Sequence, residues 1–257
     1  MSTLLAAALW TLVFCAPGYP GGTGDAQPLV DQFASAAAAV SGWPAGSLAA
    51  VYDPTEQGGL AKLSSADAVL AFVPYPFFAE HAGGLHLTPL VQADVADIGP
   101  QQRWTLVAKS GRVTGPASMA GYTILSVAGY APDFVRHGAL ADWSLPQDVK
   151  IEATGQILSA LRRVAAGEPV AVLLDQTQAA ALSTLPFAAE LKVLTQSAEL
   201  PIAFIAVVGS RVSADRARAL QMGLLKMGHE PGGADTLGPL RLRGFVLPKL
   251  PSPAAAR

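Results

Sequence analysis

The sequence has a single cysteine, Cys15, and only four histidines in 257 residues. One cysteine excludes an internal disulfide. The histidines are scattered and lack the spacing of metal ligands, at positions His81, His86, His137 and His229. We therefore expect no disulfide framework, no metal site and no cofactor.

Charge is also scarce. Charged residues make up 14% of the chain and the formal net charge is -2. A chain with this balance lacks the basic surface that binds a nucleic-acid backbone or an anionic membrane. Hydrophobic residues make up 51%, which excludes disorder for the body of the chain. Since aromatic residues reach only 7%, we expect a core of alanine, valine and leucine.

The common catalytic signatures are missing as well. The sequence contains no Gly-x-Ser-x-Gly motif of a nucleophile, no Cys-x-x-Cys and no His-Glu-x-x-His. Cys15 has no histidine that the sequence places near it, and Asp94 and Asp97 lie in a polar loop. We interpret these absences as favouring a binding protein over an enzyme.

The first residues have two interpretations. Residues 3–16 form an apolar run with the length of a signal-peptide core, which is too short to span a bilayer. No lysine or arginine precedes Lys62, so the charged segment of a signal peptide is missing. The same run contains a possible buried strand, Trp10–Phe14. We favour the strand, because cleavage after Ala16 would remove an element of the predicted sheet, and an export signal then lies upstream or is absent.

Short apolar runs alternate with amphipathic stretches along the whole chain, which is typical of an α/β fold. Strands are expected at 10–14, 48–52, 68–73, 103–109, 122–127, 170–174, 190–194 and 201–208. Helices are expected at 26–41, 57–64, 154–166 and 213–227. Thr154 is the predicted N-cap of the clearest helix and Gly167 its end. The length of the chain suits one large domain or two lobes.

A glycine-rich loop, Gly18–Gly24, follows the first strand and contains Tyr19 and Thr23. Its glycines let backbone N–H groups approach a ligand, and the start of the following helix adds a partial positive charge. The loop lacks the Lys-Ser/Thr ending of a nucleotide-binding P-loop. We expect a ligand-binding loop here, and a simple flexible connection is the alternative.

A second glycine-containing turn between a strand and a helix follows the strand that ends near Ser126. Gly129 lies in this turn, and a helix is expected to begin after it. We expect free N–H groups at Gly129, Tyr130 and Ala131 to hold an anionic oxygen. The alternative is an ordinary connection between a strand and a helix.

Two side chains follow the ends of other strands. Asp175 ends an apolar strand, and ligands of open α/β sheets collect at the carboxyl ends of strands. Its carboxylate can accept a hydrogen from a ligand or cap the next helix, and the two roles can coexist. Tyr75 can offer its hydroxyl to a cleft or pack in the core.

Four segments together resemble the periplasmic phosphate-, phosphite- and phosphonate-binding proteins of ABC importers. The most specific piece is a helix that ends in Ala166-Gly167-Glu168, followed by a strand and Asp175. The resemblance extends over roughly residues 10–247. The segments are Ser65–Tyr75, Ser126–Phe134, Ile157–Glu168 with Val170–Asp175, and Gln196–Pro201.

The resemblance implies two Rossmann-like lobes joined by a two-strand hinge, with the ligand cleft between them. Residues 8–98 plus 200–247 would form the first lobe and residues 99–199 the second. The proline- and alanine-rich tail, 248–257, is expected to fray. The chain would cross between the lobes near 101–103 and again near 197–201.

The same resemblance implies ligand contacts from Tyr19 and Tyr75 in the first lobe, and from the turn at 128–130 and Asp175 in the second. The chain departs from the family pattern, in which Ser or Thr hydroxyls stand just before the glycine of that turn. Val127 and Ala128 stand there instead, so Ser126 is the nearest hydroxyl. Each hydroxyl bond to a charged oxygen contributes about 1.5–3 kcal/mol. Zwitterions and more apolar metabolites therefore stay open beside small anions.

We therefore predict a periplasmic or otherwise extracytoplasmic solute-binding protein. It is expected to capture a small anionic ligand, phosphonate-like, phosphate-like or another oxyanion, for an ABC importer by hinge closure. The implied partners are this ligand and a membrane permease, without nucleic acid and without direct insertion into a membrane. The alternatives are an enzyme on the same fold, with Cys15, His81 or His137 as its reactive residue, and a ligand-sensing module without transport.

Overall fold

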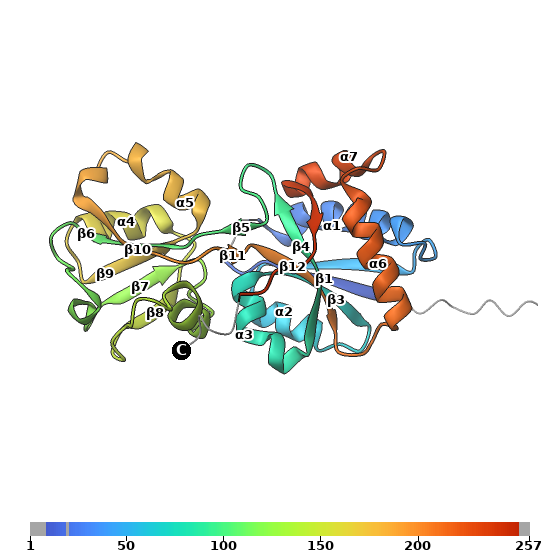
Figure 1. Cartoon of the computed structure of the whole chain (residues 1–257), viewed down its shortest axis with the longest axis horizontal. Helices are drawn as coiled ribbons and strands as arrows, with labels where there is room; N and C mark the ends of the chain where they lie inside the picture. Colours follow the sequence, from blue (N-terminus) through green and yellow to red (C-terminus); the bar gives the residue numbers. More distant parts are fainter. Residues whose placement is uncertain (1–8, 19–20, 252–257) are drawn as a thin grey trace, which may run out of the picture.

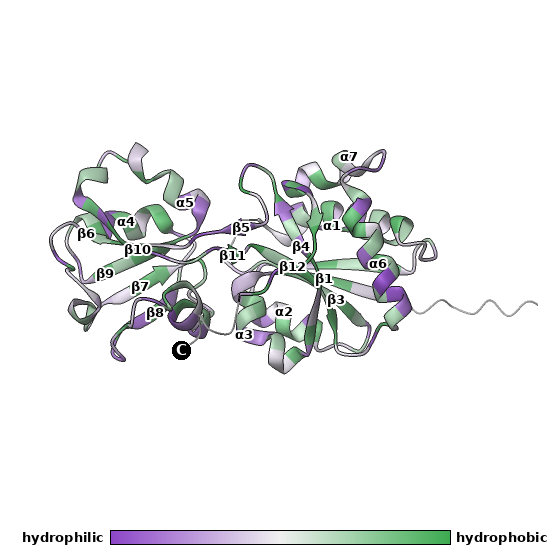
Figure 2. Ribbon diagram, in the orientation of Figure 1, coloured by the Kyte–Doolittle hydropathy of each residue, from purple (hydrophilic) through white to green (hydrophobic). Residues whose placement is uncertain are grey.

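Two α/β lobes lie end to end in the computed structural model, which describes residues 9–18 and 21–251. Each lobe is built on its own β-sheet, and helices lie against both sheets (Figure 1). Hydrophobic residues gather in the strands of both sheets (Figure 2), where they form the cores. The predicted α/β class with two lobes is confirmed.

The first lobe contains a six-stranded sheet in the order β13-β4-β12-β3-β1-β2. The central strand β1 runs parallel to β2 and β3, whereas β12 runs antiparallel to β3 and β4. Because β1 is buried between two neighbours, the prediction of a buried first strand is confirmed. The bounds are β1 Trp10–Cys15, β2 Leu48–Asp53, β3 Ala68–Pro74, β4 Leu87–Val95, β12 Ala203–Val208 and β13 Leu242–Val246.

Helices cover both faces of this sheet. On one face, α1, α6 and α7 pack over a core that contains Phe33 and Leu224. On the other face, α2 and α3 pack over a core that contains Leu63 and Phe77. The bounds are α1 Thr23–Val40, α2 Glu56–Leu63, α3 Tyr75–Leu85, α6 Ala214–Met227 and α7 Gly233–Leu237.

The second lobe contains a five-stranded sheet in the order β10-β6-β9-β7-β8. One face is covered by α4, and the other by the irregular segment that includes the π-helical turn η2, Phe134–Ala139. The bounds are β6 Thr105–Lys109, β7 Thr123–Ser126, β8 Lys150–Ala153, α4 Ile157–Ala165, β9 Val170–Leu174, α5 Gln176–Ala180 and β10 Leu191–Gln196, with short 3-10 turns at Pro116–Met119, Leu182–Thr184 and Ala188–Glu190.

Two crossing segments join the lobes, and they pair with each other. Strand β5, Gln101–Gln102, runs antiparallel to β11, Leu200–Pro201. Just beyond this pair, the Trp104 N–H donates to Ser197 Oγ at 2.9 Å, and the Ser197 N–H donates to the Trp104 carbonyl at 2.8 Å. The predicted two-strand hinge is confirmed, and it holds the two crossovers side by side.

Two edge strands were not predicted, and one cap was placed wrongly. Strand β8 ends the second sheet and β13 ends the first. Both strands are short, and charged residues or glycine interrupt their apolar residues, which hides the pattern of a strand. Because β8 occupies residues 150–153, α4 begins only after Gln156, and Thr154 instead accepts a hydrogen bond from the Gln156 N–H at 3.0 Å. The N-cap predicted at Thr154 is therefore wrong.

The predicted lobe boundaries, 8–98 plus 200–247 and 99–199, stay a prediction, and we propose the paired β5 and β11 as the place of division. The described part of the C-terminal tail, residues 248–251, is held at Lys249, whose N–H donates to Gln92 Oε1 at 3.0 Å. The rest of the predicted frayed tail, and residues 3–8 of the N-terminal apolar run, lie outside the described residues.

Candidate functional site

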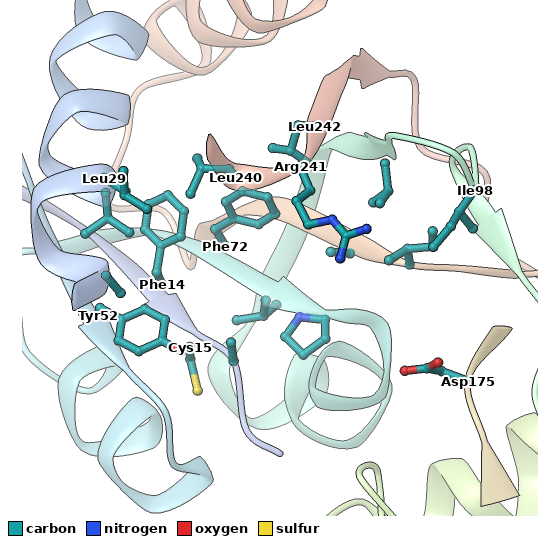
Figure 3. A pocket seen from close by; sticks show the side chains of 18 of the residues that line it. Phe14, Cys15, Leu29, Tyr52, Phe72, Ile98, Asp175, Leu240, Arg241 and Leu242 are labelled. Atoms are coloured by element: carbon teal, nitrogen blue, oxygen red, sulfur yellow. The ribbon is translucent and has the colours of Figure 1, made fainter. Parts of the chain in front are cut away.

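A cavity of about 370 Å³ lies where the two lobes meet, a size typical of sites for small molecules (Figure 3). The first lobe provides most of its wall, at the carboxyl ends of β1, β2 and β3 and along α1. The second lobe provides Asp175 and Thr177, and the hinge strand β5 provides Gln102. The cavity therefore lies at the strand ends where ligands of α/β folds collect.

The part of the cavity that lies deeper in the first lobe is apolar. Figure 3 shows Phe14 and Phe72 beside each other there, with Leu29 and Leu240 around them. The ring centroids of Phe14 and Phe72 are 4.9 Å apart. Such a wall buries an apolar body of a ligand and offers it few hydrogen bonds.

Asp175 stands at the opposite end of the cavity, directly after the buried strand β9. Its Oδ1 accepts a hydrogen bond from the Gln178 N–H at 2.8 Å, and Gln178 Oε1 accepts one from the Asp175 N–H at 3.1 Å. These reciprocal bonds form a capping box for α5, so the predicted cap is confirmed. The residue is only 6% exposed. The carboxylate is therefore held rigidly in a place with little water.

The buried position of Asp175 changes its acidity. Burial raises the pKa of the carboxyl above its ordinary value, while the N–H groups of Gln178 and Thr177 act in the opposite direction. A cationic ligand group beside the carboxylate would offset the loss of solvation. The site therefore favours a ligand with a positive charge or a hydrogen-bond donor at this end.

Arg241 is the cationic residue in the wall of the same cavity, on the side of the first lobe. Its backbone has φ 57, in the left-handed region, and is fixed by two bonds of 2.8 Å: its N–H donates to the Gly238 carbonyl, and its carbonyl accepts from the Ala96 N–H. Across residues 9–18 and 21–251, no carboxylate pairs with its guanidinium. Arg241 was not predicted from the sequence, because it precedes the unpredicted strand β13.

The turn around Gly129 does not offer the donors that the sequence suggested. The Gly129 N–H donates to the Ser126 carbonyl at 3.1 Å, and the Ala131 N–H donates to the Ala128 carbonyl at 2.9 Å. The expectation of free N–H groups at Gly129 and Ala131 is therefore wrong. Gly129 is required for another reason, since a Cβ there would lie 2.2 Å from the Glu152 carbonyl oxygen of β8.

Ser126 is fully buried under the same turn. Its hydroxyl donates to the Leu173 carbonyl at 2.8 Å and accepts from the Ala128 N–H at 3.1 Å. A bond to a ligand would have to replace one of these internal bonds. In this arrangement the hydroxyl holds the end of β7 to β9 and to the turn. Tyr130, the next predicted contact, is half-buried in the turn.

A carboxylate of the protein itself reaches the start of the helix that follows the turn. Glu80, on α3 of the first lobe, accepts a hydrogen bond from the Phe134 N–H of the second lobe at 3.3 Å. An anion favours such a position, because N–H groups at the start of a helix lack partners. The place of an external anion is thus taken by a side chain that also joins the two lobes.

Of the predicted contacts in the first lobe, Tyr75 and Thr23 do not line the cavity of Asp175. Tyr75 is half-buried, and its ring packs edge-on against Phe134 and Phe204 at centroid distances of 5.7 and 5.9 Å. Burial raises the pKa of its hydroxyl. It lines a separate cavity of about 340 Å³, together with residues 137–143 and 195–200. Thr23 is exposed at the start of α1, outside the wall of the Asp175 cavity. Tyr19 lies outside the described residues.

The glycine-rich loop touches the second lobe at one point. Gly18 has φ +81, and a Cβ built on it would lie 2.3 Å from the Val127 carbonyl oxygen. Only glycine permits this approach of two backbones without a shift. Together with the contacts of Tyr75 and Glu80, it closes the lobes against each other beside the cavity.

Cys15 also lines the cavity, and its environment suppresses the thiolate. Burial raises the pKa of the thiol to about 12, with further contributions from the negative charges of Asp53 and Glu56 and an opposing one from Lys62. A thiolate is the reactive form of cysteine. His81 is bonded through Nε2 to Glu56 Oε1 at 2.8 Å. In the part of the chain that the structure describes, no three potential metal ligands cluster.

Within the same described ranges, no helix is both long and apolar enough to cross a bilayer. The family described as "ABC transporter, phosphonate, periplasmic substrate-binding protein" matches residues 92–251, more than half of the chain. No curated protein matches the sequence.

Several solved structures share the fold at low sequence identity. A Xanthomonas citri protein bound to a chloride ion has a TM-score of 0.68 and 14% identity, over 97% of this chain and 94% of its own. A binding protein component of an ABC phosphonate transporter from Pseudomonas aeruginosa has a TM-score of 0.61 and 15% identity, over 93% and 82%. PhnD1 from Prochlorococcus marinus, in complex with methylphosphonate, has a TM-score of 0.58 and 12% identity, over 93% of each chain.

Proposed function

The chain belongs to the family of periplasmic substrate-binding proteins of phosphonate-type ABC transporters, and from this premise we propose that it captures its solute in the cavity at Asp175. The family gives the protein a solute-binding role in ABC transport. We choose this cavity because its wall comes from both lobes and from the hinge.

A ligand that touches both lobes binds the closed arrangement better than the open one. Binding then shifts the balance between open and closed states, since a ligand moves a conformational equilibrium by its difference in affinity. The short paired strands β5 and β11 are the hinge of this motion. A membrane permease then distinguishes the closed protein from the open one, and the protein works outside the cytoplasm.

We propose binding without catalysis. The support is chemical: the Cys15 thiol, with a pKa of about 12, is protonated at neutral pH, and His81 is already bonded to Glu56. His137 lies in the wall of the Tyr75 cavity, not in the cavity of Asp175. Cys15, His81 and His137 were the candidates for the reactive residue of an enzyme on this fold.

The predicted contacts receive different roles in this proposal. Asp175 contacts the ligand. Tyr75 packs between the lobes. Ser126 and Gly129 shape the turn of the second lobe, with Tyr130 beside them. Thr23 begins α1, outside the wall of the Asp175 cavity, and receives no ligand contact in this proposal.

Thermal unfolding against a library of small solutes tests the proposal. The protein is first unfolded and refolded, so that any bound solute is removed. A solute at a hundred times its dissociation constant stabilises the folded state by about 2.7 kcal/mol, which raises the melting temperature by several degrees. The expected result is a response to a few chemically related solutes, with a smaller radius of gyration in solution scattering. A broad library without any response would overturn the proposal.

A further inference from the structure

Two opposite charges face the cavity from the two lobes. Asp175 follows β9 of the second lobe, and Arg241 precedes β13 of the first. Both residues line the same cavity. Figure 3 shows their side chains directed into the space between the lobes, away from Leu29 and Tyr52 in the apolar part. The cavity is thus divided into an apolar part and a part with one acidic and one basic side chain.

We propose that this cavity takes a zwitterion with an apolar body, of the class of α-amino acids with an aliphatic or aromatic side chain. The ammonium group pairs with Asp175 and the carboxylate with Arg241. The apolar side chain lies among Phe14, Leu29, Phe72 and Leu240. This inference rests on the proposed function and adds the ligand class.

The anionic end of the ligand needs Arg241, and the backbone holds that residue in place. Both its N–H and its carbonyl are bonded, to Gly238 and Ala96. A residue other than glycine in the left-handed region is strained, and such strain clusters at ligand sites. Across the described ranges the guanidinium has no acidic partner, so a ligand carboxylate has no internal competitor there.

A simple oxyanion fits the same cavity poorly. Asp175 would place a second negative charge beside it in a site with little water, where like charges repel strongly. Gly129 and Ala131, whose N–H groups the sequence suggested for an oxyanion, do not line this cavity, and both N–H groups are bonded within their own turn. The start of the following helix already receives Glu80. A zwitterion avoids the repulsion, because its ammonium group faces the carboxylate.

A zwitterion would also couple binding to the proposed closure. Its two charged ends meet groups on different lobes, so both bonds form only when the lobes are together. The ligand thereby contributes a difference in affinity between the closed and open states, as the proposed function requires.

Isothermal titration calorimetry with three probes tests the ligand class. L-leucine carries both charges, 4-methylpentanoate carries only the carboxylate, and isopentylamine carries only the ammonium group. We expect L-leucine or L-phenylalanine to bind at least about tenfold more tightly than either single-charge probe, because each lost charge-assisted bond weakens binding by about tenfold or more. Methylphosphonate, the matched oxyanion, is expected to bind more weakly than L-leucine.

Two variants assign the charges. Asp175→Asn keeps an oxygen that can cap α5, and it is expected to weaken L-leucine binding by at least about 30-fold while leaving 4-methylpentanoate unchanged or improved. Arg241→Gln is expected to weaken the binding of L-leucine by about tenfold while leaving the binding of isopentylamine unchanged. Arg243→Gln is the matched control, since Arg243 lies nearby in the chain, pairs with Asp94 and does not line the cavity. It is expected to bind like the wild type.

The outcomes separate this inference from the proposed function. If methylphosphonate or another solute without an ammonium group binds most tightly and lowers the radius of gyration, the proposed class of zwitterionic ligands is wrong and the solute-binding role stands. If L-leucine binds but Asp175→Asn does not weaken it, the assignment of the site is wrong. If no solute in the library binds, both fail. Melting temperatures of the unliganded variants that lie well above the temperature of the titration ensure that affinity and not folding is compared.

Discussion

Replacing Gly18 by alanine perturbs the contact between the lobes with a single methyl group. The new Cβ would stand 2.3 Å from the Val127 carbonyl oxygen, and it would also meet the carbonyl carbon at 3.1 Å. Both atoms belong to the backbone, so no side chain can rotate to make room. We therefore expect Gly18→Ala to oppose the closed arrangement of the lobes.

The substitution has two effects of different origin. The left-handed backbone at φ +81 costs an alanine about 1–2 kcal/mol in whichever state keeps that conformation. The overlap with Val127 exists only where the lobes touch, and overpacking of this kind typically costs about 1–3 kcal/mol. Only the second effect shifts the balance between open and closed states. It corresponds to a loss of about 5- to 150-fold in ligand affinity.

The assay is calorimetry with the best solute from the thermal screen. Gly42→Ala is the matched control, since Gly42 has φ +67 and, among the described residues beyond its chain neighbours, no heavy atom lies within 4 Å of the position that its Cβ would take. It bears the backbone cost alone, so it should lower the melting temperature without changing affinity. Equal affinities of Gly18→Ala and the wild type would refute the reasoning, because the loop would then play no part in closure.

Three further predictions concern the acidity and packing of named groups. Burial raises the folded pKa of Asp175 above its unfolded pKa, so the stability that this carboxyl contributes is complete below the unfolded pKa and is lost as pH rises through the folded pKa. The free energy of unfolding of unliganded Asp175→Asn, measured in urea, should therefore rise relative to that of the wild type between about pH 4 and about pH 7. A difference that stays constant with pH would contradict this. Gly59→Ala places a Cβ 2.0 Å from Cys15 Sγ and should lower the free energy of unfolding in denaturant by about 1–3 kcal/mol. Gly83→Ala meets open space and should raise the free energy of unfolding by about 0.5–1 kcal/mol. Since the Cys15 thiol has a pKa of about 12, mass spectrometry should find iodoacetamide modification far slower in the folded protein than in urea at about pH 8, and equal rates would show an accessible thiolate.

Local patterns in the sequence predicted much of the fold. The apolar run at Trp10–Phe14 indicated the central strand, and Asp175 after an apolar strand indicated a helix cap, because both depend only on neighbouring residues. The crossings near 101–103 and 197–201 were placed by resemblance. The edge strands β8 and β13 were not predicted, whereas the edge strands β2 and β10 were. Strand β8 carries Lys150 and Glu152 in only four residues, and β13 carries Arg243 and Gly244 in five, so neither shows a clear apolar run.

The site could be predicted only in part, because its residues meet through long-range packing. Glu80 and Phe134 are 54 positions apart and meet across the lobes. No local pattern shows that this carboxylate takes the start of the second-lobe helix. Ser126 likewise bonds a strand 47 positions away. Arg241 reaches the cavity from a segment whose structure was not predicted at all, so its charge could not be assigned to the ligand.

The central claim is that the solute binds between the lobes at Asp175. A crystal structure with the solute that raises the melting temperature most tests it directly. We expect the solute in the cavity between Phe72 and Asp175, in contact with both lobes, with the Gly18–Val127 approach preserved. A solute bound in the cavity of Tyr75, or held by one lobe alone, would contradict it.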